Sequence, residues 1–278
     1  MNKIDDISFS VLISVYKKEK PEFFNEALDS VYTQTMPPSE VMICEDGKLS
    51  RELEAIIEKY KKRFPEQTRV IKYPMNRGLG KTLRDGILEC SNEIIFRMDS
   101  DDISARDRFE KQLAIMQETK ADVVGSNIVE YNEEMSIKTG KRVVPEFNND
   151  IKRYARKRNP INHMTVCYRK SAVIDAGNYL AMDGFEDYFL WVRMINNGAS
   201  FYNVQEPLVN VRGGGSMISR RGGLPYAKKI IAFEKELKRM KYISLIQYYA
   251  NLIPRVAVSI IPSSFRRAIY TKGLRRRV

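Results

Sequence analysis

Three carboxylates, Asp99, Asp101 and Asp102, stand close together directly after the apolar segment 93–98. That segment predicts a buried strand, so the acids are expected where the strand ends. Like charges at such close spacing are unfavourable unless a positive partner neutralises them. Mg²⁺ or Mn²⁺ on a diphosphate would do so, because both take oxygen ligands from carboxylates and phosphates. An acidic turn capping a helix that begins near Ile103 is the alternative interpretation.

Two earlier predicted strands also end in polar residues. The segment 8–16 ends in Ser14 and Tyr16, and the segment 40–46 ends in Asp46. Helix-like segments separate these strands, which indicates βαβ units and a parallel sheet, where the carboxyl ends of the strands share one ligand-binding edge. That edge would offer an aromatic ring, hydrogen-bond acceptors and a metal site, as a nucleoside diphosphate requires. Ordinary turn residues at each strand end are the alternative.

Hydrophobic periodicity assigns the other elements of an α/β fold. The predicted helices are 21–34, a helix capped by Ser50, 78–90, 109–116 and 187–196. The further predicted strands are 69–73, 121–131, 163–169 and the extended segment 201–211, before a glycine-rich loop at 212–223.

The net charge of +12 is concentrated near the C-terminus. The segment 228–278 holds thirteen Lys/Arg and two Asp/Glu, whereas the preceding residues are almost neutral. A basic segment of this kind favours an anionic partner, either nucleic acid or anionic lipid. The single histidine, His163, excludes a metal site built from several histidines.

The ordered motifs SVLISVY, VMICEDG, NRGLGKTLRDGI, IIFRMDSDD and GFEDYFLWVRMINNG resemble those of the family-two nucleotide-sugar glycosyltransferases. The resemblance covers roughly 8–212 and is strongest to bacterial enzymes that build capsule, exopolysaccharide or O-antigen repeats, through RFEKQ at 108–112 and the segment 162–177. It implies a GT-A fold, which is a Rossmann-like, mostly parallel sheet flanked by helices. A basic, partly apolar helical extension would follow that fold.

The resemblance assigns the donor site to residues of the first half. Ser14 and Tyr16 would line the nucleobase pocket, and Asp46 would accept the imide N–H of a pyrimidine, which favours UDP over GDP. Asp99 and Asp101 would hold the ribose. The remaining assignments are Asp101 and Asp102 for Mn²⁺ or Mg²⁺, and Asn76, Lys81 and Arg84 for the surroundings of the diphosphate. Solvated positions on a helix are the alternative for Lys81 and Arg84.

The resemblance also assigns catalysis with inversion at the sugar. Asp187 would be the general base that deprotonates the acceptor hydroxyl, and Glu186 would orient it or bind acceptor. Both acids would also suit a helix N-terminus. Three further residues are candidate acceptor or phosphate contacts, namely His163, Trp191 and Arg212. Structural roles are the alternatives for His163 and for Trp191, which would lie in the core. Arg212 and the loop 213–216 would form a mobile lid over the diphosphate, and an ordinary linker is the alternative.

We expect a catalytic domain at 1–225, with a nucleotide-sugar half at about 1–120 and an acceptor half at about 121–225. We expect 226–278 to be helical and to associate with anionic membrane, because apolar residues are interrupted there by polar ones and flanked by basic ones. The protein would be cytoplasmic and peripheral on the inner face of the membrane, with a lipid-linked saccharide as acceptor. A nucleotidyltransferase and a nucleic-acid-binding protein are the competing interpretations. The near-neutral catalytic part argues against the latter.

Overall fold

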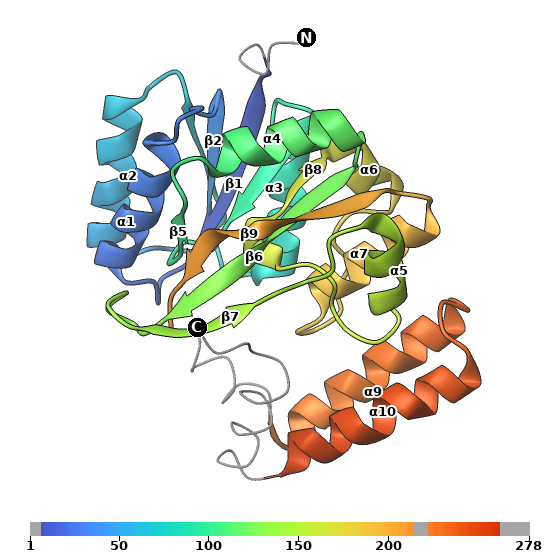
Figure 1. Cartoon of the computed structure of the whole chain (residues 1–278). Coiled ribbons are helices and arrows are strands. Elements are labelled where there is room, and N and C mark those ends of the chain that lie inside the picture. Colours follow the sequence, from blue (N-terminus) through green and yellow to red (C-terminus); the bar gives the residue numbers. More distant parts are fainter. Residues whose placement is uncertain (1–6, 214–221, 262–278) are drawn as a thin grey trace.

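The strands of the first half form one side of a mixed sheet. The helices that connect them cover both faces of that sheet (Figure 1). The computed structural model describes residues 7–213 and 222–261. Within that part the sheet order is β3-β2-β1-β4-β8-β6-β9-β5, with β7 paired to β6. The strands are β1 (Phe9–Val15), β2 (Glu40–Glu45), β3 (Thr68–Lys72), β4 (Ile94–Met98), β5 (Ile103–Ser104), β6 (Val123–Tyr131), β7 (Lys138–Arg142), β8 (Cys167–Arg169) and β9 (Phe201–Val211).

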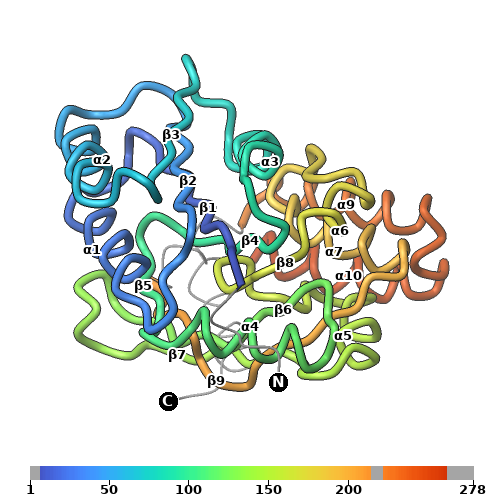
Figure 2. Tube along the Cα trace, turned by 90° about the horizontal axis from the view of Figure 1, so that it is seen from above, coloured from blue at the N-terminus to red at the C-terminus, as the bar shows by residue number. Residues whose placement is uncertain are grey.

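The four strands β3, β2, β1 and β4 are parallel, as the sequence predicts. Their carboxyl ends therefore lie along one edge of the sheet. The connecting helices are α1 (Pro21–Tyr32), α2 (Arg51–Arg63) and α3 (Leu79–Glu89), and α4 (Arg108–Thr119) follows the acidic segment. The tube view shows α1 and α2 on the opposite side of β1 and β2 from α3 (Figure 2).

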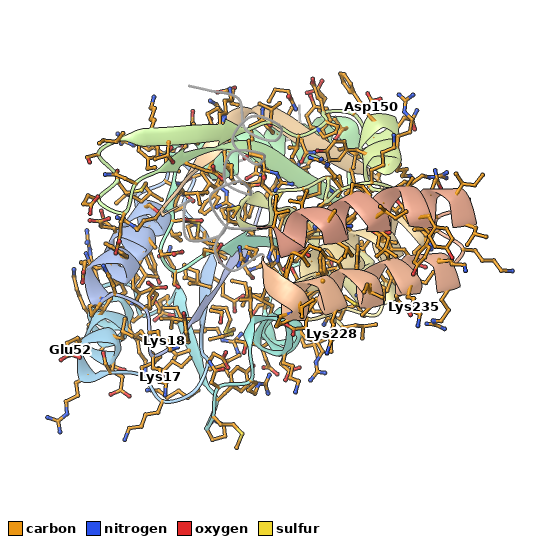
Figure 3. The ribbon with its side chains drawn as sticks, turned by 90° about the horizontal axis from the view of Figure 1, so that it is seen from below. Lys17, Lys18, Glu52, Asp150, Lys228 and Lys235 are labelled. Atoms are coloured by element: carbon orange, nitrogen blue, oxygen red, sulfur yellow. The ribbon has the colours of Figure 1, made fainter. Side chains whose placement is uncertain are left out.

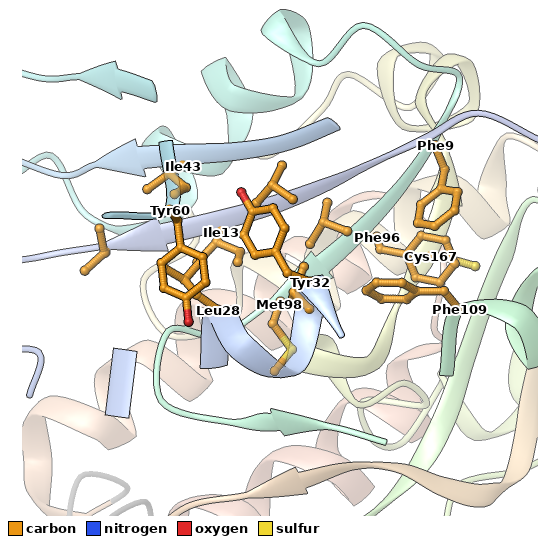
Figure 4. Packing of buried hydrophobic residues seen from close by; sticks show 14 of the residues in the cluster. Phe9, Ile13, Leu28, Tyr32, Ile43, Tyr60, Phe96, Met98, Phe109 and Cys167 are labelled. Atoms are coloured by element: carbon orange, nitrogen blue, oxygen red, sulfur yellow. The ribbon is translucent and has the colours of Figure 1, made fainter. Parts of the chain in front are cut away.

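Alternating residues of β1 enter two separate cores, because successive side chains of a strand point to opposite faces. Phe9 belongs to the core under α1, α2 and α4, where it packs against Phe96 and Phe109 with ring centroids 5.0 and 5.3 Å away (Figure 4). Leu12 belongs to the core on the other face, which includes Trp191. Both faces are covered, so only the strand ends of this half remain for ligands.

The second half differs from its predicted strand at 163–169. His163–Thr165 forms a single 3₁₀ turn, and only Cys167–Arg169 pairs in the sheet, antiparallel to β4 and β6. The turn forms because the hydroxyl and backbone N–H of Thr165 both bond to the carbonyl oxygen of Asn162. Apolar β-branched composition alone does not reveal such a local turn. The remaining helices are α5 (Asn148–Tyr154), α6 (Lys170–Asp175) and α7 (Glu186–Asn196).

A helical hairpin of α9 (Gly223–Arg239) and α10 (Leu245–Ile260) packs on α7. Phe233 stacks on Phe185 with centroids 4.6 Å apart, and it also contacts Tyr188. Ser244 caps α10 in a capping box with Gln247. Among the described helices, none has both the length and the apolar character needed to cross a bilayer.

Candidate active site

Three carboxylates meet where β4 ends. One oxygen from each of Asp99, Asp101 and Asp102 lies within 4.8 Å of the others, and Asp102 is buried. Burial, followed by the charge of Asp99, raises the pKa of Asp101 to about 7 and that of Asp102 well above its usual value. A divalent cation would relieve this repulsion, and carboxylate oxygens at this spacing are the donors that Mg²⁺ and Mn²⁺ take. The residues present therefore fit the predicted metal, which Asp101 and Asp102 would hold with Asp99 beside them.

One arginine supplies a buried positive charge behind this cluster. Arg97 lies in β4 with its side chain 2% exposed, and its Nη2 forms an ion pair with Asp99. Its Nε and Nη1 have no hydrogen-bond partner in the described part of the chain. Arg108, from the first turn of α4, donates from Nη2 to the carbonyl oxygen of Arg97 at 2.8 Å. The helix after the acidic segment thus braces the strand that carries it.

Arg212 directly follows β9 and bonds to the acidic cluster of Asp99, Asp101 and Asp102. Its backbone N–H donates to Oδ1 of Asp102 at 2.9 Å, and its Nε donates to the carbonyl oxygen of Asp101 at 2.9 Å. Its guanidinium also pairs with Glu26 of α1 and lies over the ring of Phe23. With its side chain only 4% exposed, Arg212 positions the cluster in this structure and presents little surface to a phosphate. Most of the predicted lid at 213–216 lies outside the described residues.

Asp46 fixes the turn that leads into α3. Its Oδ1 accepts from the backbone N–H of Arg77 at 2.7 Å, and its Oδ2 accepts from Nδ2 of Asn76 at 3.0 Å and from the N–H of Gly78 at 3.1 Å. Gly47 lies directly against this turn at a φ of +88°, and a Cβ there would be 2.6 Å from the nitrogen of Asn76. The structure thus brings Asp46 and Asn76 together, although sequence reasoning assigned them separately to the base and to the surroundings of the diphosphate.

The other predicted donor residues surround the same edge. The backbone N–H of Asp46 donates to the carbonyl oxygen of Val15 at 2.8 Å, which places the ends of β1 and β2 side by side. Ser14 is half-buried within β1, whereas Tyr16 is exposed just beyond it. Lys81 is exposed in the first turn of α3.

Arg84 lies one helical turn beyond that first turn of α3. Its Nε donates to Oδ1 of Asp85 at 2.7 Å, and Asp85 is shared with Arg77. The described contacts therefore direct Arg84 toward Asp85 and do not place it at the acidic cluster.

The two acids of the second motif lie at the N-terminus of α7. Oδ2 of Asp187 accepts from Nδ2 of Asn159 at 2.6 Å, which leaves Oδ1 for another donor. Burial raises the pKa of Glu186. A Cβ on Gly80 would be 3.0 Å from Cγ of Glu186, so the first turns of α3 and α7 are in contact. The N-termini of both helices carry partial positive charge, which favours an anion between or beside them.

Tyr179 has a buried hydroxyl behind the site. Burial raises its pKa against the opposing charge of Arg97, and the carboxylates of Asp187 and Asp99 add smaller increases. Nε2 of His163 lies 2.6 Å from the same hydroxyl. Burial also lowers the pKa of His163 well below its usual value, so its ring is neutral at pH 7. Trp191 is fully buried, and the structure does not bring it to a surface that an acceptor could contact.

Three contributors to the site were not predicted from sequence. Arg97 carried a signal, because a charged residue inside an apolar strand needs a buried partner. Asn159 carried none, since it lies 28 positions from Asp187 and tertiary structure alone brings it there. Tyr179 is close to Asp187 in the chain, but nothing in its spacing indicates that its hydroxyl meets His163.

The model of glycosyl transferase family 2 matches residues 10–177, which is more than half of the chain. The chain belongs to glycosyl transferase family 2. This membership confirms the predicted family and the predicted enzyme class, since the protein is a glycosyltransferase. It also decides against the nucleotidyltransferase and nucleic-acid-binding interpretations as the main activity.

Two bacterial relatives match this glycosyltransferase over nearly its whole length. An Escherichia coli protein named UDP-Gal:alpha-D-GlcNAc-diphosphoundecaprenol beta-1,3-galactosyltransferase is 35% identical over 273 residues, which cover 98% of each chain. The amylovoran biosynthesis glycosyltransferase AmsE of Erwinia amylovora is 35% identical over 266 residues, covering 95% of this chain and 98% of the relative.

Solved structures confirm the predicted GT-A fold. The Staphylococcus aureus TarS fragment 1-349 in complex with UDP-GlcNAc is similar with a TM-score of 0.67 at 18% identity, covering 96% of this chain and 76% of that one. The mannosyltransferase PcManGT from Pyrobaculum calidifontis in complex with GDP-Man and Mn²⁺ is similar with a TM-score of 0.63 at 12% identity, covering 96% and 81%. At these identities the likeness establishes the fold.

Proposed function

We propose that this glycosyltransferase transfers a hexose from a UDP-sugar, with inversion, to a hydroxyl of a lipid-linked saccharide during assembly of a surface polysaccharide such as capsule, exopolysaccharide or O-antigen. The end-to-end similarity to an enzyme named for UDP-galactose and a diphosphoundecaprenol acceptor supports the substrate classes. The observation that carries the proposal is the single sheet edge that holds Asp46, the acidic cluster and the N-termini of α3 and α7.

The donor would bind along this edge. Oδ1 of Asp46 accepts one hydrogen bond and retains a lone pair for the imide N–H of uracil, beside Ser14 and Tyr16. Asp99 and Asp101 would hold the ribose, and Asn76, with Lys81 or Arg84, would adjoin the diphosphate. Mn²⁺ or Mg²⁺ on Asp101 and Asp102 would neutralise charge on the departing diphosphate. The Mn²⁺ in the structure of the mannosyltransferase from Pyrobaculum calidifontis supports this choice of cofactor.

The acceptor hydroxyl would be activated by Asp187. Asn159 donates to one carboxylate oxygen of Asp187, and the other oxygen would then accept the proton of an incoming hydroxyl, as a general base must. Glu186, at the contact between α3 and α7, would orient Asp187 or bind the acceptor. Tyr179 and the neutral His163 would shape the space between this base and the acidic cluster.

We place the catalytic domain at 1–225 and propose that the 226–278 region associates with the inner face of the cell membrane. A lipid-linked acceptor resides in a membrane, and the strongly basic C-terminal segment suits an anionic one. The contact of α9 with α7 means that this region is also attached to the helix that carries Asp187.

A donor screen tests the proposal. The purified chain is incubated with Mn²⁺, a synthetic GlcNAc-diphosphate-lipid with a short water-soluble tail, and UDP-galactose, UDP-glucose, UDP-GlcNAc or GDP-mannose. We expect transfer from a UDP-sugar, with the anomeric configuration of the product inverted relative to the donor in NMR spectra. Transfer from GDP-mannose alone, or retention of configuration, would contradict the proposal.

A further inference from the structure

The outer side of α10 is made entirely of apolar side chains. Its exposed positions recur with helical spacing and form what we call the α10 face, namely Leu245, Ile246, Tyr249, Ala250, Ile253, Pro254, Ala257 and Ile260. Ile246 is 82% exposed and Ile253 is 64% exposed. A helix on a protein surface in water normally turns its polar residues outward, so this face calls for a partner.

The polar residues of α10 point the other way. Asn251 is buried and donates from Nδ2 to the carbonyl oxygen of Arg156 at 2.8 Å. Arg255 forms an ion pair with Glu234, which is fully buried on α9. Ser259 is also buried. Satisfied polar contacts therefore fix the orientation of α10 and hold its apolar side outward.

The neighbouring helix α9 adds exposed positive charge beside this face. The exposed charged residues of α9 are all cationic, namely Lys228, Lys235, Lys238 and Arg239. Figure 3 shows α9 and α10 side by side, with Lys228 and Lys235 along α9. The segment 262–278, which follows α10, contains six Lys/Arg and no Asp/Glu.

A basic cavity also borders the first turn of α10. It has a volume of about 750 Å³ and lies between α5, the end of α7 and the connection from α9 to α10. Five of its lining residues are cationic, namely Lys152, Arg153, Arg156, Lys157 and Lys241, against the single acid Asp150. Gln247 of α10 lines it as well. Its size and charge suit an anionic headgroup beside the apolar face.

We propose that the α10 face is the surface by which the enzyme docks on an anionic lipid bilayer, with its apolar side chains at the acyl boundary and the surrounding cations on lipid headgroups. This choice of partner rests on the proposed lipid-linked acceptor and on the charge of the surface. A second copy of the chain would bring two cationic surfaces together, whereas anionic lipid neutralises them. The hairpin lies on the side of the molecule toward which β1 runs, which is the side where the parallel strands end (Figure 1). Docking would therefore hold the donor edge, meaning the strand ends that carry Asp46 and the acidic cluster, near the membrane.

Flotation of the full-length chain with vesicles tests this proposal. Vesicles that contain phosphatidylglycerol are compared with pure phosphatidylcholine at low and high salt. We expect binding to the anionic vesicles that weakens as salt rises. The double variant Ile246→Glu/Ile253→Glu should lower the partition coefficient by about tenfold or more, because carboxylates enter an apolar boundary unfavourably. Ile137→Glu is the matched control, since Ile137 is also 64% exposed but lies directly before β7, outside the α9–α10 hairpin, and this variant should bind as the wild type does.

Transfer to the water-soluble acceptor separates the docking proposal from the proposed function. We expect the double variant to transfer sugar to that acceptor within about twofold of the wild-type rate, because it leaves the donor edge unchanged. A wild-type chain that floats with vesicles but transfers no sugar would support docking and refute the function. A chain that transfers sugar but binds no vesicles would refute docking. A dimer in light scattering that Ile253→Glu dissociates, without vesicle binding, would also refute docking and assign the face to a second copy.

Discussion

Replacing Arg97 by methionine would remove the buried charge behind the acidic cluster while keeping much of the apolar stem. The guanidinium is almost fully buried, and its ion pair with Asp99 is its one described side-chain partner. Its loss leaves Asp99 without a partner beside two other carboxylates. Breaking a fully buried pair costs about 3–5 kcal/mol, and because the side chain of Asp99 is 29% exposed we expect a cost of about 2–3 kcal/mol. Against a domain stability of about 5–15 kcal/mol, that is a large loss, so Arg97→Met should lower the urea midpoint strongly.

The response of this variant to Mn²⁺ distinguishes a metal site from a simple structural ion pair. Without Arg97, the three carboxylates repel one another more and attract a divalent cation more strongly. Saturating Mn²⁺ should therefore raise the unfolding free energy of Arg97→Met by more than it raises that of the wild type. Arg239→Met is the control, because Arg239 forms an exposed pair with Glu236 and its replacement should leave the urea midpoint almost unchanged. A cost for Arg97→Met below about 1 kcal/mol, or a smaller response to Mn²⁺ than in the wild type, would refute the reasoning.

Three further predictions follow from the packing and the site. Asp187→Asn should reduce turnover by about 10²–10⁴-fold with little change in donor affinity in steady-state kinetics, and a collapse of donor affinity instead would show that Asp187 binds the donor. Gly86→Ala should destabilise the fold by about 1–3 kcal/mol in urea unfolding, because its Cβ would lie 2.8 Å from a methyl of Leu12, and unchanged stability would show that the core relaxes freely. A chain truncated after Gly222 should aggregate in light scattering, because it exposes aromatic residues of α7 such as Tyr188, and a monodisperse fragment would show that α9 is dispensable.

The sequence was sufficient for the parallel half of the fold because its signals are local. Apolar runs alternate with amphipathic helices there, and each strand ends in polar residues, so the shared edge with Asp46 and the acidic cluster follows from topology. The segment 163–169 was misassigned because a side-chain hydrogen bond from Thr165 creates a turn inside an otherwise strand-like composition.

Contacts between distant residues account for what could not be predicted. Asn159 reaches Asp187 across 28 positions, and Arg212 reaches Glu26 across 186, so no spacing rule identifies either pair. In α10 the polar residues read as interruptions of an apolar segment. The structure shows that they point inward, and Arg255 does so because Glu234 is buried on α9.

Calorimetric titration of UDP tests the central claim, which is that the sheet edge of Asp46 and the acidic cluster forms a metal-dependent nucleotide site separate from the base. The account predicts that the wild type and Asp187→Asn bind UDP with similar affinity when Mn²⁺ is present. It also predicts that Asp101→Asn, or addition of a chelator, weakens that binding by at least about tenfold, because the charge on the diphosphate is no longer neutralised. Equal UDP affinity in all four titrations would contradict the account.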